Sequence, residues 1–146
     1  MHYFHKSLQN GKKGELQFLE LAKSCNWLLT QTDGRAGDFV TQSGEKVELK
    51  TDSYDHDSTG NLFIEFYSDI DKGKLGGPAQ AQMHGCKYFV YFFSKNKIAY
   101  VFDVDDLCKQ LLTIDLGKPK DIRNVRWTTR GYAVPRTLLK HVRVLK

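Results

Sequence analysis

The sequence GDFVTQSGEKVELKTD, from Gly37 to Asp52, predicts two short antiparallel strands joined by a glycine-containing turn. Because side chains alternate along a strand, Val47 and Leu49 of the second strand point to one face. Glu48 and Lys50 then point to the other face. The first face suits a hydrophobic core, whereas the second presents an acid beside a lysine.

The length of the turn decides whether Asp38 of the first strand lies beside Glu48. A two-residue loop at Ser43–Gly44 pairs Asp38 with Leu49 and separates the two acids. A three-residue loop over Gln42–Gly44, with its glycine left-handed, pairs Asp38 with Glu48. We expect the three-residue loop, or a bulge with the same effect. Two adjacent carboxylates are unfavourable unless a divalent cation holds them, although each acid alone also fits an ordinary solvated strand face.

The composition is that of a globular protein, with 146 residues of which 40% are hydrophobic and 27% charged. We expect one domain over residues 1–146 with a substantial core. No apolar run approaches the ~20 residues that a membrane span needs, and no secretory signal is visible, so we expect a cytoplasmic protein without a membrane partner. The cysteines, Cys25, Cys86 and Cys108, lack metal-binding spacing and cannot all pair, which argues against zinc and a disulfide framework.

The net charge of +5 is unevenly distributed. Residues 117–146 contain nine Lys or Arg and one acid, a net charge of +8, which leaves −3 for the rest of the chain. A basic C-terminal segment on a mildly acidic body predicts a polyanionic partner, and we favour nucleic acid over a merely solvated basic surface. No zinc-finger, helix-turn-helix or RNP pattern is present, so we expect recognition of backbone and shape. The candidate phosphate contacts are Lys12, Lys13, Arg35, Lys72, Lys74, Arg123, Arg126, Arg130 and Arg136.

Periodicity and turn residues predict the other elements. We expect helices over residues 12–25, 78–84 and 103–112, and strands over 27–32, 61–67, 87–93, 98–102 and 142–145. Residues 1–11 show no clear period, and residues 51–60 read as a polar surface loop. Pro78 suits a first helical turn.

The spacing Asp38, ten residues, Glu48-Leu-Lys50 resembles the motif of the PD-(D/E)XK nuclease superfamily, with Gly37 in place of the usual proline. The start Gly11-Lys-Lys-Gly-Glu15 is similar to that of archaeal Holliday junction resolvases, and the Asp-to-Glu spacing is similar to that of phage junction-resolving endonucleases. The resemblance runs from about Gly11 to Phe93. It implies a restriction-endonuclease-like α/β core, in which helices flank a central mixed β-sheet of three or four meandering strands and a later strand.

The resemblance also implies a DNA endonuclease that uses Mg²⁺ or Mn²⁺, of the phage type and thus acting in host cytoplasm. Asp38, Glu48 and the backbone carbonyl of Leu49 would hold the metal, and Lys50 would orient or help deprotonate the attacking water. An early helix often supplies a third acid, for which we favour Glu15 over Glu20. Further candidates for the cleft are Glu65, Gln80 and Gln82.

Other interpretations of the sequence stay open. The same fold and basic face would serve a non-catalytic nucleic-acid-binding protein, or a nuclease that acts on RNA. The sequence does not distinguish a four-way junction from a flap, mismatch, single strand or duplex. A homodimer is expected only if the substrate is a junction, in which two opposed strands are cut.

Overall fold

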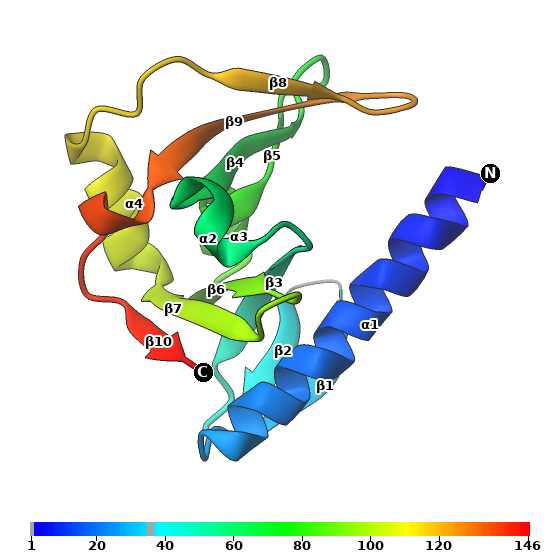
Figure 1. Ribbon diagram of the computed structural model, residues 1–146, viewed down its shortest axis with the longest axis vertical. Helices are drawn as coiled ribbons and strands as arrows, with labels where there is room; N and C mark the ends of the chain where they lie inside the picture. Colours follow the sequence, from blue (N-terminus) through cyan, green and yellow to red (C-terminus); the bar gives the residue numbers. More distant parts are fainter. Residues whose placement is uncertain (1, 35–36) are drawn as a thin grey trace.

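The structure, a computed structural model, describes the backbone of residues 2–34 and 37–146 and the side chains of residues 12–33 and 37–146 (Figure 1). Its strands form a six-stranded sheet, here sheet A, and a four-stranded sheet, here sheet B. Sheet A has the order β1-β2-β3-β6-β7-β10. Its strands are β1 (Leu29–Gly34), β2 (Gly37–Thr41), β3 (Lys46–Asp52), β6 (Tyr88–Phe93), β7 (Ile98–Asp103) and β10 (Arg143–Leu145).

Sheet A is mixed because β3 and β6 run parallel, whereas its other neighbouring strands are antiparallel. A parallel pair needs a long crossover, and residues 53–87 provide it. Strand β6 lies in the middle of the sheet, and its residues from Phe89 to Phe93 are all buried. This confirms the prediction that the apolar run is covered on both faces.

Sheet B is antiparallel, with the order β5-β4-β9-β8. Its strands are β4 (Asn61–Asp69), β5 (Lys74–Leu75), β8 (Lys120–Arg123) and β9 (Thr128–Pro135). The sequence predicted one central sheet, and this was wrong for the strand at 61–67. Strand β6 occupies the edge of β3 that β4 would need, so β4 pairs instead with β9 from the basic C-terminal segment.

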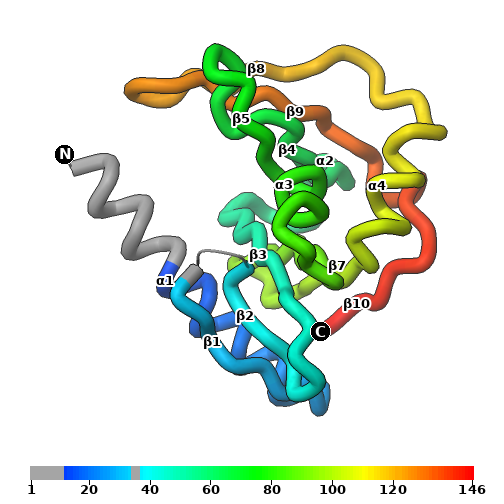
Figure 2. The backbone as a smooth tube through the Cα atoms, turned by 180° about the vertical axis from the view of Figure 1, so that it is seen from behind, coloured from blue at the N-terminus to red at the C-terminus, as the bar shows by residue number. Residues whose placement is uncertain are grey.

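Helices flank sheet A on both faces, as predicted for an α/β protein. They are α1 (His2–Ser24), α2 (His56–Thr59), α3 (Gly77–Met83) and α4 (Val104–Thr113), followed by the 3₁₀ turn η1 (Arg136–Leu138). Figures 1 and 2, seen from opposite sides, show α1 and α3 on opposite faces of the sheet. The first helix was predicted to begin at Lys12 but begins at His2, and the predicted loop over residues 51–60 contains the end of β3 and all of α2.

Two hydrophobic clusters fix this arrangement. One packs α1 on sheet A and includes Phe18, Phe39, Val47, Val90 and Phe92. The other joins the opposite face of sheet A to sheet B, α3 and α4, and includes Leu62, Ile64, Ala81, Phe89, Tyr91 and Leu107. Each large side chain in them gains about 1.5–3 kcal/mol by burial. Glu48 and Lys50 alternate with Val47, so they face the second cluster, where the two sheets meet.

Candidate functional site

The turn between β2 and β3 brings two acids side by side. Phe39 pairs with Val47 and Val40 with Lys46, so the same register places Asp38 opposite Glu48. The loop has three residues and ends in Gly44, whose φ of +88° is left-handed. The three-residue loop predicted from the sequence is therefore confirmed.

A backbone hydrogen bond fixes the first of these acids. The N–H of Leu49 donates to Oδ2 of Asp38 at 2.7 Å. The N–H and C=O of one residue point to the same side of an extended strand, so the carbonyl of Leu49 also faces the Asp38 side of β3. Two carboxylates and one backbone carbonyl thus converge beyond the paired part of β2.

Burial raises the pKa of both acids, and nearby negative charge adds to the rise. The pKa of Glu48 rises to about 7, first because burial disfavours its charged form and then because Asp38 and Glu15 are negative. Burial also raises the pKa of Asp38, against the lowering effect of the Leu49 hydrogen bond, and Glu15 adds to the rise. Both acids therefore favour their neutral form more than a solvated carboxyl does.

Glu15 of α1 lies near enough to this pair to raise the pKa of both acids, because the helix lies very close to β3. A Cβ on Gly14 would lie 2.6 Å from Oγ1 of Thr51, so only glycine permits the approach. Gln31 of β1 donates a hydrogen bond of 3.3 Å from Nε2 to Oε2 of Glu15. Of the two candidates for a third acid, Glu15 acts electrostatically on both carboxyls, whereas Glu20 is exposed on α1.

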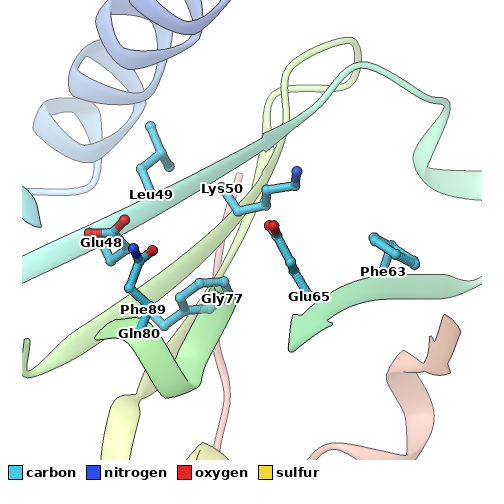
Figure 3. A pocket seen from close by; sticks show the side chains of 8 residues that line it. All are labelled: Glu48, Leu49, Lys50, Phe63, Glu65, Gly77, Gln80 and Phe89. Carbon is cyan, nitrogen blue, oxygen red and sulfur yellow. The ribbon is translucent and has the colours of Figure 1, made fainter. Parts of the chain in front are cut away.

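A pocket of about 90 Å³ opens beside Glu48 at the meeting of the two sheets. Figure 3 shows Glu48 and Lys50 on one wall and, across from them, Glu65 pointing toward Lys50. Burial raises the pKa of Glu65, and the positive charge of Lys50 partly offsets that rise. Gln80 of α3 lines the same pocket, together with Leu49, Phe63, Gly77 and Phe89.

The structure brings together most of the predicted site residues but not all of them. Gln82 donates a hydrogen bond of 3.0 Å to Oδ1 of Asp105, on the exposed side of α3. Arg130 forms two bonds to Asp121, and Arg136 donates to the carbonyl of His56 at 2.6 Å, so both have partners within the chain. Arg35 lies outside the described residues. The other candidate basic residues are exposed: Lys12, Lys13, Lys72, Lys74, Arg123 and Arg126.

The sequence analysis missed two residues that pack behind the site, Gly37 and Cys86. Gly37 has a φ of +102°, which proline cannot adopt, and a Cβ there would lie 3.3 Å from Sγ of Cys86. Glu48 and Asp38 in turn contribute to a raised thiol pKa at Cys86, of about 11, after the larger effect of burial. In the sequence, the available indication of this backbone conformation was Gly37 itself, at the position where the PD-(D/E)XK motif usually has a proline.

The donor set fits a hydrated divalent cation of the Mg²⁺ type. Such ions prefer carboxylate and carbonyl oxygens and keep several waters. Asp38, Glu48 and the Leu49 carbonyl offer such oxygens. Among residues 12–33 and 37–146, no three His, Cys, Asp or Glu side chains are grouped so that they could hold an ion by themselves.

In the described part of the chain, no helix has the length and hydrophobicity to span a membrane. Comparison of the sequence with protein-family models and with curated proteins, and of the fold with solved structures, finds no significant match.

Proposed function

We propose that this protein is a metal-dependent DNA endonuclease of the PD-(D/E)XK type. One observation carries the proposal: Asp38 and Glu48 lie on opposed positions of a hairpin with raised pKa values, and Lys50 follows Glu48 on the same face of β3. A solvated strand face would leave these acids with ordinary pKa values.

The order of elements supports the proposal. A helix, three antiparallel strands, a helix and a strand parallel to the third occur in that order as α1, β1-β2-β3, α3 and β6. The sequence resemblance implies this order for a restriction-endonuclease-like core. Strands β4 and β5 are then an insertion between β3 and α3, and β9 completes the sheet that this insertion begins.

Asp38, Glu48 and the Leu49 carbonyl would hold Mg²⁺ or Mn²⁺, with Glu15 acting through water. The bound metal supplies Lewis-acid activation of water and neutralises charge on the phosphate. Lys50 lies beside Glu48, where it can orient or deprotonate the attacking water and stabilise the developing charge. Hydrolysis of the phosphodiester bond then leaves a 5′-phosphate and a 3′-hydroxyl.

The experiment that tests the proposal is cleavage of labelled four-way junction, flap and linear duplex DNA in Mg²⁺, Mn²⁺ or EDTA. We compare the wild type with Lys50→Ala and with Lys87→Ala, an exposed lysine that pairs with Asp103 at 2.6 Å, away from the pocket. We expect metal-dependent cleavage that Lys50→Ala abolishes and Lys87→Ala retains. Paired nicks across the junction would identify a junction resolvase, and cuts in the other substrates would identify a different nuclease.

Two outcomes would replace the proposal. DNA binding without cleavage, equal in the wild type and Lys50→Ala and independent of metal, would leave a nucleic-acid-binding protein. If RNA versions of the same substrates are cleaved in a Lys50-dependent way and the DNA substrates are not, the enzyme is a ribonuclease on the same site.

A further inference from the structure

The β8–β9 hairpin extends beyond the rest of sheet B. Figures 1 and 2 both show its tip projecting past the turn between β4 and β5. Its tip is well ordered by hydrogen bonds: the N–H of Asn124 donates to the carbonyl of Trp127 at 2.7 Å, and its side-chain amide donates to Oγ1 of Thr129 at 3.0 Å. Val125 and Arg126 therefore form a two-residue turn at the end of a stiff ribbon.

The tip of the hairpin exposes three apolar side chains to solvent. Trp127 is 42% exposed, Val125 74% and Ile122 40%. An exposed tryptophan is costly to leave in water, and no ring contact to Trp127 occurs within residues 12–33 and 37–146. The other tryptophan, Trp27, packs edge-on against Phe18.

Ile122 and Trp127 lie on the same face of sheet B as Glu65, which lines the pocket. Gly131 pairs with Glu65, and Ile122 pairs with Thr129, so the alternation along β9 puts these four residues on one face. Trp127 continues that alternation two residues before Thr129. Trp127 lies four residues along β9 from Gly131, the partner of Glu65, and four residues along a strand rise about 13 Å.

The charge around the tip suits a polyanion. Residues 118–130 contain five basic residues and one acid, a net charge of +4, and that acid, Asp121, is bound by Arg130. Arg123 and Arg126 flank the exposed side chains and are themselves exposed. Like charges oppose the pairing of two such tips, so the charge favours nucleic acid over a second copy of this chain.

We propose that the β8–β9 hairpin is a DNA-binding arm whose Trp127 stacks on an unpaired or unstacked base of a DNA whose phosphate is held at Glu48 and Lys50. The inference rests on the proposed function and narrows its substrate to DNA that exposes a base, as at a branch, flap or gap. Aromatic stacking on bases tolerates any sequence, which agrees with recognition of shape. Arg123 and Arg126 bind the phosphates next to that base and so bring Trp127 to the point where the DNA exposes it.

The test is binding measured in EDTA, where no metal-dependent cleavage occurs. The probes are a blunt duplex and a forked duplex of the same sequence, with 2-aminopurine at successive positions of the fork. The variants are Trp127→Ala, Trp127→Phe, Arg126→Ala and Leu112→Ala, the last a matched control because Leu112 is 86% exposed on α4.

We expect Trp127→Ala to weaken binding of the fork about tenfold or more and binding of the duplex less than twofold. Trp127→Phe should retain most of the fork affinity, and Arg126→Ala should weaken both DNAs alike. Wild type should quench 2-aminopurine at one position of the fork, and Trp127→Ala should not. Leu112→Ala should match the wild type.

Equal weakening of fork and duplex by Trp127→Ala, or no weakening, would overturn the inference. So would a change of oligomeric state in Trp127→Ala, measured by sedimentation, because the tip would then be a protein interface. The two proposals fail separately. A wild type that never cleaves but shows Trp127-dependent fork binding removes the nuclease alone, whereas metal-dependent cleavage without a Trp127 effect removes the stacking arm alone.

Discussion

The Leu49 N–H donates a hydrogen bond of 2.7 Å to Oδ2 of Asp38, which ties the acid of one strand to the backbone of the next. This bond uses one carboxylate oxygen and leaves the other for a cation at the proposed metal site. It also lowers the pKa of Asp38, although burial outweighs it. The position of Asp38 therefore depends on the register of β2 and β3 rather than on its own rotamer alone.

A divalent cation should stabilise the fold through the two carboxylates. At ten times its dissociation constant, Mn²⁺ should add about 1.4 kcal/mol to the free energy of unfolding and raise the melting temperature by about 3–5 °C. Asp38→Asn and Glu48→Gln should each remove the increase, while Glu20→Gln, an exposed acid on the same helix as Glu15, should keep it. Thermal melting with and without Mn²⁺ measures this. An equal rise in all four proteins would mean that the ion binds elsewhere.

Stability without metal should fall as the pH rises. The folded pKa of Glu48, about 7, lies above its ordinary value of 4.5, so the folded state binds more protons than the unfolded state between these values. The contribution is fully present below about pH 4.5 and lost by about pH 7, and it amounts to at most about 3 kcal/mol.

Denaturant unfolding in EDTA at pH 5 and pH 7.5 measures this pH effect. Glu48→Gln should reduce the loss of unfolding free energy between pH 5 and pH 7.5, because its amide does not titrate. Glu20→Gln should leave this loss unchanged. Burial raises the pKa of Asp38 and Glu65 as well, so some decline should persist in Glu48→Gln. A wild type that gains stability from pH 5 to pH 7.5 would contradict the electrostatics of the site.

Two glutamines of α3 form a matched pair. Gln80 lines the pocket with Glu48, whereas Gln82 binds Asp105 outside it. We expect Gln80→Ala to lower the single-turnover cleavage rate about tenfold or more, because a polar group near the reacting phosphate is lost. Gln82→Ala should cleave at the wild-type rate. Equal rates in the two variants would remove Gln80 from the site.

The proline that the motif usually carries should not be tolerated here. Gly37 has a φ of +102°, and proline is restricted to about −65°, so Gly37→Pro should destabilise the protein by about 3 kcal/mol or more. Gly117→Asn is the control, since Gly117 is also left-handed, with a φ of +69°, but has open space around it. Urea unfolding should show a large loss only in Gly37→Pro. A stable and active Gly37→Pro would mean that β2 can start in another conformation.

The close approach of α1 to β3 can be measured by a double-mutant cycle. Gly14→Ala gains about 1 kcal/mol in helix propensity but forces its Cβ against Oγ1 of Thr51, which costs about 1–3 kcal/mol. We expect a net loss of stability, together with slower cleavage because Glu15 moves. In the Thr51→Ala background the same change should cost less or become stabilising. Additive effects in the cycle would show that the contact is not the cause.

The hairpin of the site was predictable because its determinants are local. Turn length, the glycine at position 44 and the alternation of Val47 to Lys50 together fix which side chains share a face. Burial of the run from Phe89 to Phe93 followed from its apolar composition, and the start of α3 followed from Pro78.

The second sheet was not predictable because its pairing is long-range. Strand β4 alternates like any half-buried strand, and nothing within residues 61–69 indicates that its partner is β9, more than sixty residues later. The place of Glu65 opposite Lys50 depends on where sheet B packs. The difference between Gln80 and Gln82 likewise depends on how α3 packs against the pocket and α4. For the same reason, the bond of Arg136 to the carbonyl of His56, eighty residues earlier, could not be predicted from composition.

The meeting of two sheets at the pocket has a consequence for the timing of activity. Lys50 and Glu65 leave the ribosome early, but β4 gains its main partner only when residues 128–135 have followed. A nascent chain that ends before residue 128 already contains Asp38, Glu48 and Lys50, but its β4, which carries Glu65, still lacks its partner β9. We therefore expect the wall that carries Glu65 to be complete only once β9 has been added, and proteolytic removal of β9 to disturb that wall while it leaves the hairpin of Asp38 and Glu48 covalently intact.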